Sequence, residues 1–212
     1  MELTPTQYYE RVLAHVGPDG RLGPQETAAW TTFPYEPENL RVRVFDPPVV
    51  PEPERRGVAA ADCSTCSSWD RGIWRNERFR VSLMDPSGVP VEVLLTIREH
   101  VDFTELGDGD AAEQGQLLVH LARLVEHLPH VARAHVDRWG DGSYHSHVFV
   151  SGRPEGQLQL RGTLGVLWWD ILPAVPAELA AGYARTLARG LCERFGGEVL
   201  IEDDGDPDGA HR

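Results

Sequence analysis

Two histidines, His145 and His147, stand one residue apart in the segment 143-SYHSHVFV-150, whose other residues are typical of a β-strand. Side chains two positions apart in a strand point to the same face of the sheet. The sequence therefore predicts two imidazoles side by side on one sheet face, in a chain with nine histidines among its 212 residues. This pairing is the first sign of a functional site, and it requires a fold that contains a sheet.

The composition limits the classes of function. A hydrophobic fraction of 41% over 212 residues is enough for one globular domain with additions. Neither a transmembrane segment nor the basic-then-apolar layout of a signal peptide is visible, so a cytoplasmic protein is expected. The net charge of −13 argues against binding to nucleic acid or to a membrane surface, but not against a small phosphate-bearing molecule held in a local basic pocket. All twenty basic side chains are arginine, which excludes a lysine nucleophile or Schiff base.

The pattern of apolar residues predicts an α+β fold. Two runs rich in β-branched residues, 79–84 and 91–97, are separated by turn residues and indicate a hairpin. Leucines at helical spacing predict an amphipathic helix over 108–128, which we expect to pack on one side of an antiparallel sheet. Further predicted elements are strands at 131–139, 145–152 and 196–201 and a helix at about 176–195.

The chain is predicted to have four parts. Thr4 and Gln7 form a capping-box pattern that starts an N-terminal helix, and 47-PPVVPEPERRG-57 is typical of extended chain. The helices outside the main domain carry apolar faces, so their segments should pack on it. The parts are an N-terminal extension (1–61), the main domain (62–153), a C-terminal helical extension (154–201) and an acidic, disordered tail (202–212).

Two cysteines, Cys63 and Cys66, have the C-x-x-C spacing that lets two thiolates bind one metal ion from a tight turn. Redox pairs share this spacing, but here the pair precedes a polar turn rather than opening a helix after a buried strand. A four-coordinate zinc site needs two further ligands, and His100 and His145 stand at the ends of predicted strands, where distant segments can meet. The alternative is that the cysteines are free thiols and the histidines are ordinary strand-end residues.

This order of residues resembles the histidine-triad superfamily, in particular its zinc-bearing branch, which includes galactose-1-phosphate uridylyltransferase-like proteins. The resemblance covers about residues 62–153 and rests on the C-x-x-C pair, on the histidine closing 97-IREH-100 and on the H-x-H of 145–147. It implies a HIT-like antiparallel sheet with a structural zinc ion bound by Cys63, Cys66, His100 and His145. It also implies a homodimer, although the added segments would cap the usual dimer face.

The resemblance assigns the central chemical role to His147. In the family, this histidine attacks an α-phosphate and forms a covalent nucleotidyl–imidazole intermediate, which suits a neutral imidazole near neutral pH. The preceding turn, with Gly142 and Ser143, would offer N–H groups and a hydroxyl to phosphate oxygens. The other candidate substrate-binding residues are Asp85, Arg153, Gln159 and Arg161. The alternatives are an ordinary hydrogen-bonded histidine on a sheet face and solvated surface arginines.

Two positions depart from the family's pattern. Phe149 stands where the family has a histidine or glutamine, and a phenyl ring donates no hydrogen bond to a phosphate. Asp137 stands where an asparagine near the phosphate is usual, and a carboxylate there would repel a phosphate anion. Three functions are therefore open: a hydrolase or nucleotidyl transferase acting through His147, an enzyme using Asp137 and His147 for non-phosphoryl acid–base chemistry, and an inactive zinc-stabilised module that binds a small molecule.

Overall fold

The computed structural model describes residues 4–18, 20–21, 33–35, 46–169 and 171–201, and the predicted acidic tail lies outside these ranges. The chain divides into two compact units, Met1–Glu54 and Arg55–Arg212. In the described part of the chain, no helix is both long enough and apolar enough to cross a membrane.

The described residues of the first unit include one helix, α1 (Pro5–Leu13). Its start is the predicted capping box: the Thr4 hydroxyl accepts the Gln7 N–H at 3.2 Å, and the Gln7 side chain accepts the Thr4 N–H at 2.9 Å. The box satisfies two backbone groups that a helix start leaves without partners. The expected packing of the N-terminal extension on the main domain stays a prediction.

The second unit is built on a six-stranded sheet in the order β4-β5-β3-β2-β1-β6, in which every pair of neighbours is antiparallel. The predicted α+β fold is confirmed, and so is the hairpin of β2 and β3. The strands are β1 (Trp74–Arg75), β2 (Phe79–Leu83), β3 (Glu92–Ile97), β4 (Val131–Asp137), β5 (His147–Pro154) and β6 (Glu198–Val199). The helices are α2 (Ser64–Ser67), α3 (Asp108–Glu126), α4 (Gly165–Trp169) and α5 (Ala177–Phe195).

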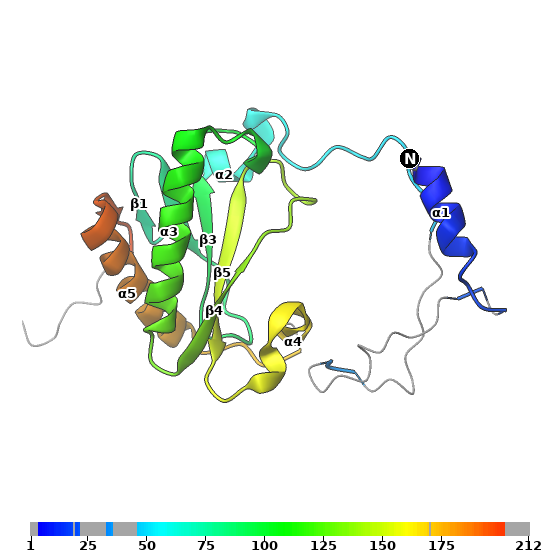
Figure 1. Ribbon diagram of the computed structural model, residues 1–212. Coiled ribbons are helices and arrows are strands. Elements are labelled where there is room, and N and C mark those ends of the chain that lie inside the picture. Colours follow the sequence, from blue (N-terminus) through cyan, green and yellow to red (C-terminus); the bar gives the residue numbers. More distant parts are fainter. Residues whose placement is uncertain (1–3, 19, 22–32, 36–45, 170, 202–212) are drawn as a thin grey trace, which may run out of the picture. The chain divides into compact units, whose positions relative to one another are not determined.

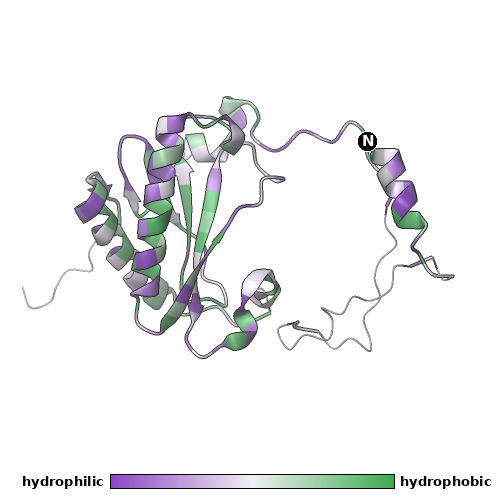
Figure 2. Ribbon diagram, in the orientation of Figure 1, coloured by the Kyte–Doolittle hydropathy of each residue, from purple (hydrophilic) through white to green (hydrophobic). Residues whose placement is uncertain are grey.

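One face of the sheet is covered by α3, as Figure 1 shows, and α5 packs beside α3. Leu117, Leu121 and Val125 of α3 are fully buried in the same cluster as Val93 and Leu95 of β3. These positions recur every three to four residues, so they form one apolar stripe on the helix. Much of β3 and β5 is correspondingly apolar in Figure 2. The predicted packing of the 108–128 helix on the sheet is confirmed.

The C-terminal segment is part of this unit and contributes to its sheet. The indole N–H of Trp74, a residue with no exposed surface, donates to the Gly196 carbonyl at 2.9 Å. The Leu200 N–H donates to the Ile73 carbonyl at 2.9 Å, next to the pairing of β6 with β1. The last strand is shorter than the predicted 196–201, because Gly196 and Gly197 both adopt positive φ angles before it begins.

The opposite face of the sheet carries polar side chains in rows across the strands. Residues directly opposite each other in antiparallel strands point to the same face. Arg80 pairs with Thr96, and Thr96 pairs with His147, so these three side chains form one row. The neighbouring row is Ser82, Leu94, Phe149 and Asp137.

The start of β5 differs from the sequence prediction. A strand was expected from His145, but β5 begins at His147, and His145 lies in the bend before it. The reason is that the Ser146 N–H donates to the Val101 carbonyl at 2.8 Å and so does not continue the ladder with β3. The two imidazoles are therefore not a simple pair on one strand face, and each has its own surroundings.

Substituting Gly197 tests how far the C-terminal segment contributes to stability. Its φ is +83°, and a Cβ would lie 2.2 Å from the Arg75 carbonyl oxygen, so Gly197→Ala should lower the free energy of unfolding by roughly 2 kcal/mol or more. Gly196→Ala is the matched control, because its φ is +67° but no atom lies within 4 Å of the added Cβ. Equal losses in a urea-unfolding measurement of the two variants would contradict the close packing of this segment on β1.

Candidate metal centre and the adjacent histidine

Four side chains from three separate segments converge at one end of the sheet: Cys63, Cys66, His100 and His145. Their ligand atoms all lie within 4.8 Å of one another. His145 Nδ1 is 3.3 Å from the sulfur of Cys63 and 3.5 Å from that of Cys66, while His100 Nδ1 is 3.3 Å from the Cys66 sulfur. The structure thus brings together all four residues that the sequence offered as metal ligands.

The tautomers of the two histidines are fixed by backbone carbonyls. His145 Nε2 lies 2.7 Å from the Ile97 carbonyl, and His100 Nε2 lies 3.0 Å from the Val58 carbonyl. A carbonyl only accepts hydrogen bonds, so each Nε2 carries the proton and each Nδ1 presents a lone pair to the cluster. The two Nδ1 atoms are 3.4 Å apart. Two facing lone pairs at this distance repel each other unless a cation lies between them.

The donor set fits a tetrahedral zinc ion. Zinc–sulfur bonds of about 2.3 Å and zinc–nitrogen bonds of about 2.0–2.1 Å give tetrahedral edges of about 3.3–3.8 Å. Four of the six distances between ligand atoms, 3.3 to 3.5 Å, lie within that range. Hydrogen bonds from the distal ring nitrogens to carbonyls are also the usual way in which histidine ligands are oriented.

Burial affects the ligands in the metal-free protein. Burial raises the pKa of the Cys66 thiol to about 11, and the Cys63 thiol adds to the effect. Burial also lowers the pKa of His145, with a contribution from the charge of His100, although the hydrogen bond to the Ile97 carbonyl acts the other way. A neutral His145 is ready to bind a metal, whereas Cys66 must first lose its proton. Metal affinity should therefore rise with pH.

Local backbone structure sets the positions of these ligands. Cys63 is the residue before the one-turn helix α2, and Cys66 lies within that helix. The C-x-x-C pair therefore opens a one-turn helix, which was not expected, and the expected polar turn follows that helix at 68–70. The pair does not follow a buried strand, as expected, because a short 3-10 helix (Ala60–Asp62) precedes it. Gly57, with a φ of +67°, passes close to the pair, since a Cβ there would lie 3.2 Å from the Cys63 Cα.

His147, the predicted nucleophile, lies next to this cluster with both ring nitrogens near backbone carbonyls. Its Nδ1 is 2.8 Å from the carbonyl of His145, and its Nε2 is 3.2 Å from the carbonyl of Trp139. A neutral imidazole has one N–H, so it can donate to only one of the two carbonyls. The shorter contact favours the Nδ1–H tautomer, which leaves the lone pair on Nε2.

One aromatic ring, that of Phe149, lies against the His147 ring, and the Trp139 ring lies against Phe149. The Phe149 ring lies edge-on to it, with centroids 5.7 Å apart, and the Trp139 and Phe149 rings are 6.4 Å apart. Asp137 pairs with Phe149 across the β4–β5 ladder, on the same face as His147. Among the described residues, no hydrogen bond joins Asp137 to His147.

The turn before His147 is held by two arginines that the sequence did not single out. Arg55 Nη1 donates to the Gly140 carbonyl at 3.0 Å, and Arg56 donates to the Gly142 carbonyl through its Nε at 3.1 Å and its backbone N–H at 3.2 Å. Ser143 forms an isolated bridge with Arg56. The carbonyls of Gly140 and Gly142 are thus occupied by arginines, which fixes the path of the turn.

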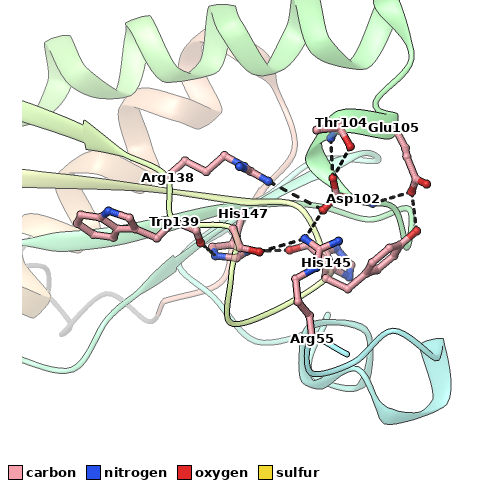
Figure 3. A network of polar contacts seen from close by, with 10 residues as sticks. Arg55, Asp102, Thr104, Glu105, Arg138, Trp139, His145 and His147 are labelled. Carbon is pink, nitrogen blue, oxygen red and sulfur yellow. Dashed lines mark hydrogen bonds and ion pairs between the residues drawn. The ribbon is translucent and has the colours of Figure 1, made fainter. Parts of the chain in front are cut away.

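A buried carboxylate, Asp102, organises these arginines, as Figure 3 shows. Arg55 Nη1 lies 2.6 Å from its Oδ2, Arg138 Nη2 lies 3.9 Å from the same oxygen, and Thr104 donates its N–H and hydroxyl to Oδ1. Burial alone would raise the pKa of Asp102, but the hydrogen bonds from Thr104 and the charge of Arg55 outweigh it and hold the pKa well below its usual range. The only sequence signal was the capping-box spacing of Asp102 and Glu105.

Four predicted substrate-binding residues lie away from His147. Arg153 is six residues further along β5, about 20 Å away at strand spacing, and it donates to the carbonyls of Pro154 and Gln157. Arg161 donates to the Leu158 carbonyl, and Gln159 lines a cavity of about 350 Å³ with Trp168. Asp85 follows β2 at this same far end of the sheet. Only Gly142 and Ser143 of the predicted set are near His147.

No protein-family model and no curated protein sequence matches this chain. Solved structures that resemble it include histidine-triad proteins, one of them with bound zinc, and a uridylyltransferase.

A histidine-triad protein from Bradyrhizobium japonicum is 17% identical over 56% of this chain and 88% of its own, with a TM-score of 0.47. A zinc-bound histidine-triad family protein from Mycobacterium smegmatis is 18% identical over 64% of this chain and 96% of its own, also with a TM-score of 0.47. A uridylyltransferase mutant is 23% identical over 60% of this chain and 47% of its own, with a TM-score of 0.41.

Removing one thiol tests the metal centre. The wild-type protein should contain about one zinc ion per chain, and Cys63→Ala should lose both the metal and several kcal/mol of unfolding free energy, because the remaining donors are left buried around a weakened site. Cys192→Ala is the control, since Cys192 lies outside the cluster with its thiol 3.4 Å from the Gly197 carbonyl. Metal analysis and thermal unfolding give the readout. A wild-type protein that is metal-free and equally stable with a chelator would contradict the assignment.

Proposed function

We propose that the Arg55–Arg212 unit is a histidine-triad-like enzyme that hydrolyses a nucleotide or a related phosphate compound, or transfers its nucleotidyl group, through a covalent intermediate on His147. The observation that carries the proposal is the 2.8 Å contact between His147 Nδ1 and the carbonyl of His145. This hydrogen bond holds the proton on Nδ1 and directs the lone pair to Nε2, so the ring is oriented as a nucleophile.

The proposed reaction has two steps. Nε2 of His147 attacks the α-phosphorus, a P–N bond forms, and the P–O bond to the leaving group breaks with its electron pair. Water or the oxygen of an acceptor phosphate then attacks the same phosphorus and displaces the imidazole, which regains its lone pair. The phosphoramidate is labile enough to serve as an intermediate because imidazole is a good leaving group.

Zinc has a structural role in this proposal, because four protein ligands leave no open position for a water molecule. His145 connects the metal centre to the reaction. Its ring belongs to the ligand cluster while its backbone carbonyl accepts the His147 N–H. Fixing the His145 ring therefore also fixes the group that orients the nucleophile.

Positive charge beside the turn supports binding of a phosphate. The Arg138 guanidinium lies against Gly140, where a Cβ would be 2.7 Å from it, and Arg55 bonds to the carbonyl of the same glycine. Arg56 adds a third cation at Gly142, and the carboxylates of Asp102 and of Asp141 in the turn offset two of these three positive charges. A guanidinium beside the turn could donate a hydrogen bond to the phosphate, and this would replace in part the donor that the phenyl ring of Phe149 lacks.

An inactive module that binds a small molecule is the second candidate, and one contact favours it. The Trp139 carbonyl lies 3.2 Å from His147 Nε2, on the side from which a phosphorus atom would approach. Catalysis requires this carbonyl to move away when substrate binds. If it stays in place, the site binds a ligand without forming a bond to it.

Replacing His147 separates the two candidates. Incubation with a panel of nucleotides should add a nucleotidyl mass to the wild-type protein in intact-mass spectrometry, and His147→Ala should lose the adduct and lower turnover by at least about 10³-fold. Zinc content and folding should not change, because His147 is not a ligand. His135→Ala is the control, since His135 lies on the same sheet face, opposite Ser151, and away from the metal. Full turnover by His147→Ala excludes the covalent mechanism, and ligand binding without any adduct supports the inactive module.

A further inference from the structure

A second polar site lies on the same sheet face as His147. A cavity of about 530 Å³ extends from α2 to β2 and β3. Among the described residues, its lining includes two arginines, Arg71 and Arg80, but no carboxylate, although the chain as a whole has a net charge of −13. Four hydroxyl groups also line it, those of Ser64, Thr65, Ser68 and Ser82. Leu94 and Ile73 form part of its apolar wall.

Arg80 is unusual because it is a cation with only 4% of its surface exposed. Its Nη1 donates to the Ser68 carbonyl, and its guanidinium lies 5.2 Å from the centre of the Trp69 ring. Its Nε has no hydrogen-bond partner and no exposed surface. A buried cation without an anion, and with an unused donor, costs free energy that a bound anion would recover.

The nearby groups do not supply that anion. The carboxylate of Asp70 interacts electrostatically with Arg80, but its ion pair is with Arg75, and it lines a different cavity. The thiols of Cys63 and Cys66 also interact electrostatically with Arg80, but two thiolates on one zinc ion cancel its two positive charges. In the part of the chain that the structure describes, Arg80 therefore has no carboxylate in direct ion-pair contact.

A second buried polar atom without a partner lies next to Arg80. Thr96 faces Arg80 directly in the β2–β3 ladder, has no exposed surface, and leaves its Oγ1 without a hydrogen bond. Thr96 also faces His147 in the β3–β5 ladder. Arg80 and Thr96 thus each have a buried polar atom without a partner, and Thr96 stands between Arg80 and His147 in the row.

We infer that this cavity binds an oxyanion, the phosphate or carboxylate group of a small molecule, through Arg80, Arg71 and the hydroxyl of Ser82. The apolar wall would take the uncharged part of the same molecule.

The distance between the cavity and His147 limits which substrates could contact both. This step rests on the proposed function. Arg80 and His147 are two strands apart in one row, about 10 Å between Cα atoms at the usual strand spacing. A small molecule with two anionic groups is long enough to reach from one residue to the other. The substrate class is therefore a phosphate compound that carries a second anionic group apart from the phosphate attacked by His147.

Binding of inorganic phosphate and of acetate to the zinc-loaded, full-length protein tests the inference. Isothermal titration at constant ionic strength should show a phosphate- and acetate-binding site in addition to any phosphate binding at the turn before His147, and Arg71→Gln should weaken that additional site about tenfold, the loss expected for one charged donor. Ser82→Ala should weaken it less, because a neutral donor contributes less. These two variants are used because Arg80→Gln places a new group beside the metal centre. Arg123→Gln on α3, outside the cavity, is the control and should bind like the wild type.

Each outcome has a defined meaning. Weaker binding by Arg71→Gln but not by Arg123→Gln supports the inference, and the ratio of phosphate to acetate affinity identifies the anionic group. Equal binding by these two variants, or no binding of either anion to the wild type, overturns it. His147→Ala distinguishes this site from the proposed active site: it should keep phosphate binding while losing turnover. Loss of phosphate binding in His147→Ala, with no effect of Arg71→Gln, would place the anion at the turn before β5 and overturn the inference.

Discussion

The structure of the Arg55–Arg212 unit depends on two imidazole nitrogens that face each other without a proton between them. His100 Nδ1 and His145 Nδ1 are 3.4 Å apart, and carbonyls of Val58 and Ile97 hold their protons on the far side of each ring. With two thiols beside them, these nitrogens form a donor set that could hold a zinc ion. The four side chains come from three segments, the chain around α2, the turn after β3 and the approach to β5, so a bound ion would connect these segments.

One residue, His145, connects the metal centre to the proposed nucleophile His147. The ring of His145 faces the cluster, its Nε2 donates to the carbonyl of Ile97, the last residue of β3, and its own carbonyl accepts the His147 N–H. Arg55 and Asp102 restrain the turn from the other side. His147 is therefore placed by its neighbours on both sides, while its second nitrogen faces a turn that must open for a substrate.

Local patterns predicted the parts of the fold that depend on local forces. Capping and helical spacing identified α1, α3 and α5, and the turn residues before Val91 identified the β2–β3 hairpin. The four ligands were also predictable, because the spacing of a C-x-x-C pair and the ends of strands restrict which residues can share a metal.

Features that depend on strand register could not be predicted. Arg80 becomes part of the His147 row only through the pairing of three strands, and nothing in its local sequence distinguishes it from other arginines. Arg153 is only six residues after His147 in the sequence, but the extended backbone of the strand places it at the far end of β5. The bend at His145 was missed because it is set by the distant carbonyl of Val101. Arg55 and Asp102 are 47 positions apart, and their ion pair leaves no pattern in the sequence.

The tautomer of His147 in the zinc-loaded protein tests the central claim most directly. Two-dimensional NMR that correlates ring nitrogens with ring protons distinguishes a protonated Nδ1 from a protonated Nε2 in a neutral imidazole. The account predicts a proton on Nδ1, donated to the His145 carbonyl, with the lone pair on Nε2. A proton on Nε2, donated to the Trp139 carbonyl, would contradict it, because the nitrogen that faces the substrate would then have no lone pair with which to attack.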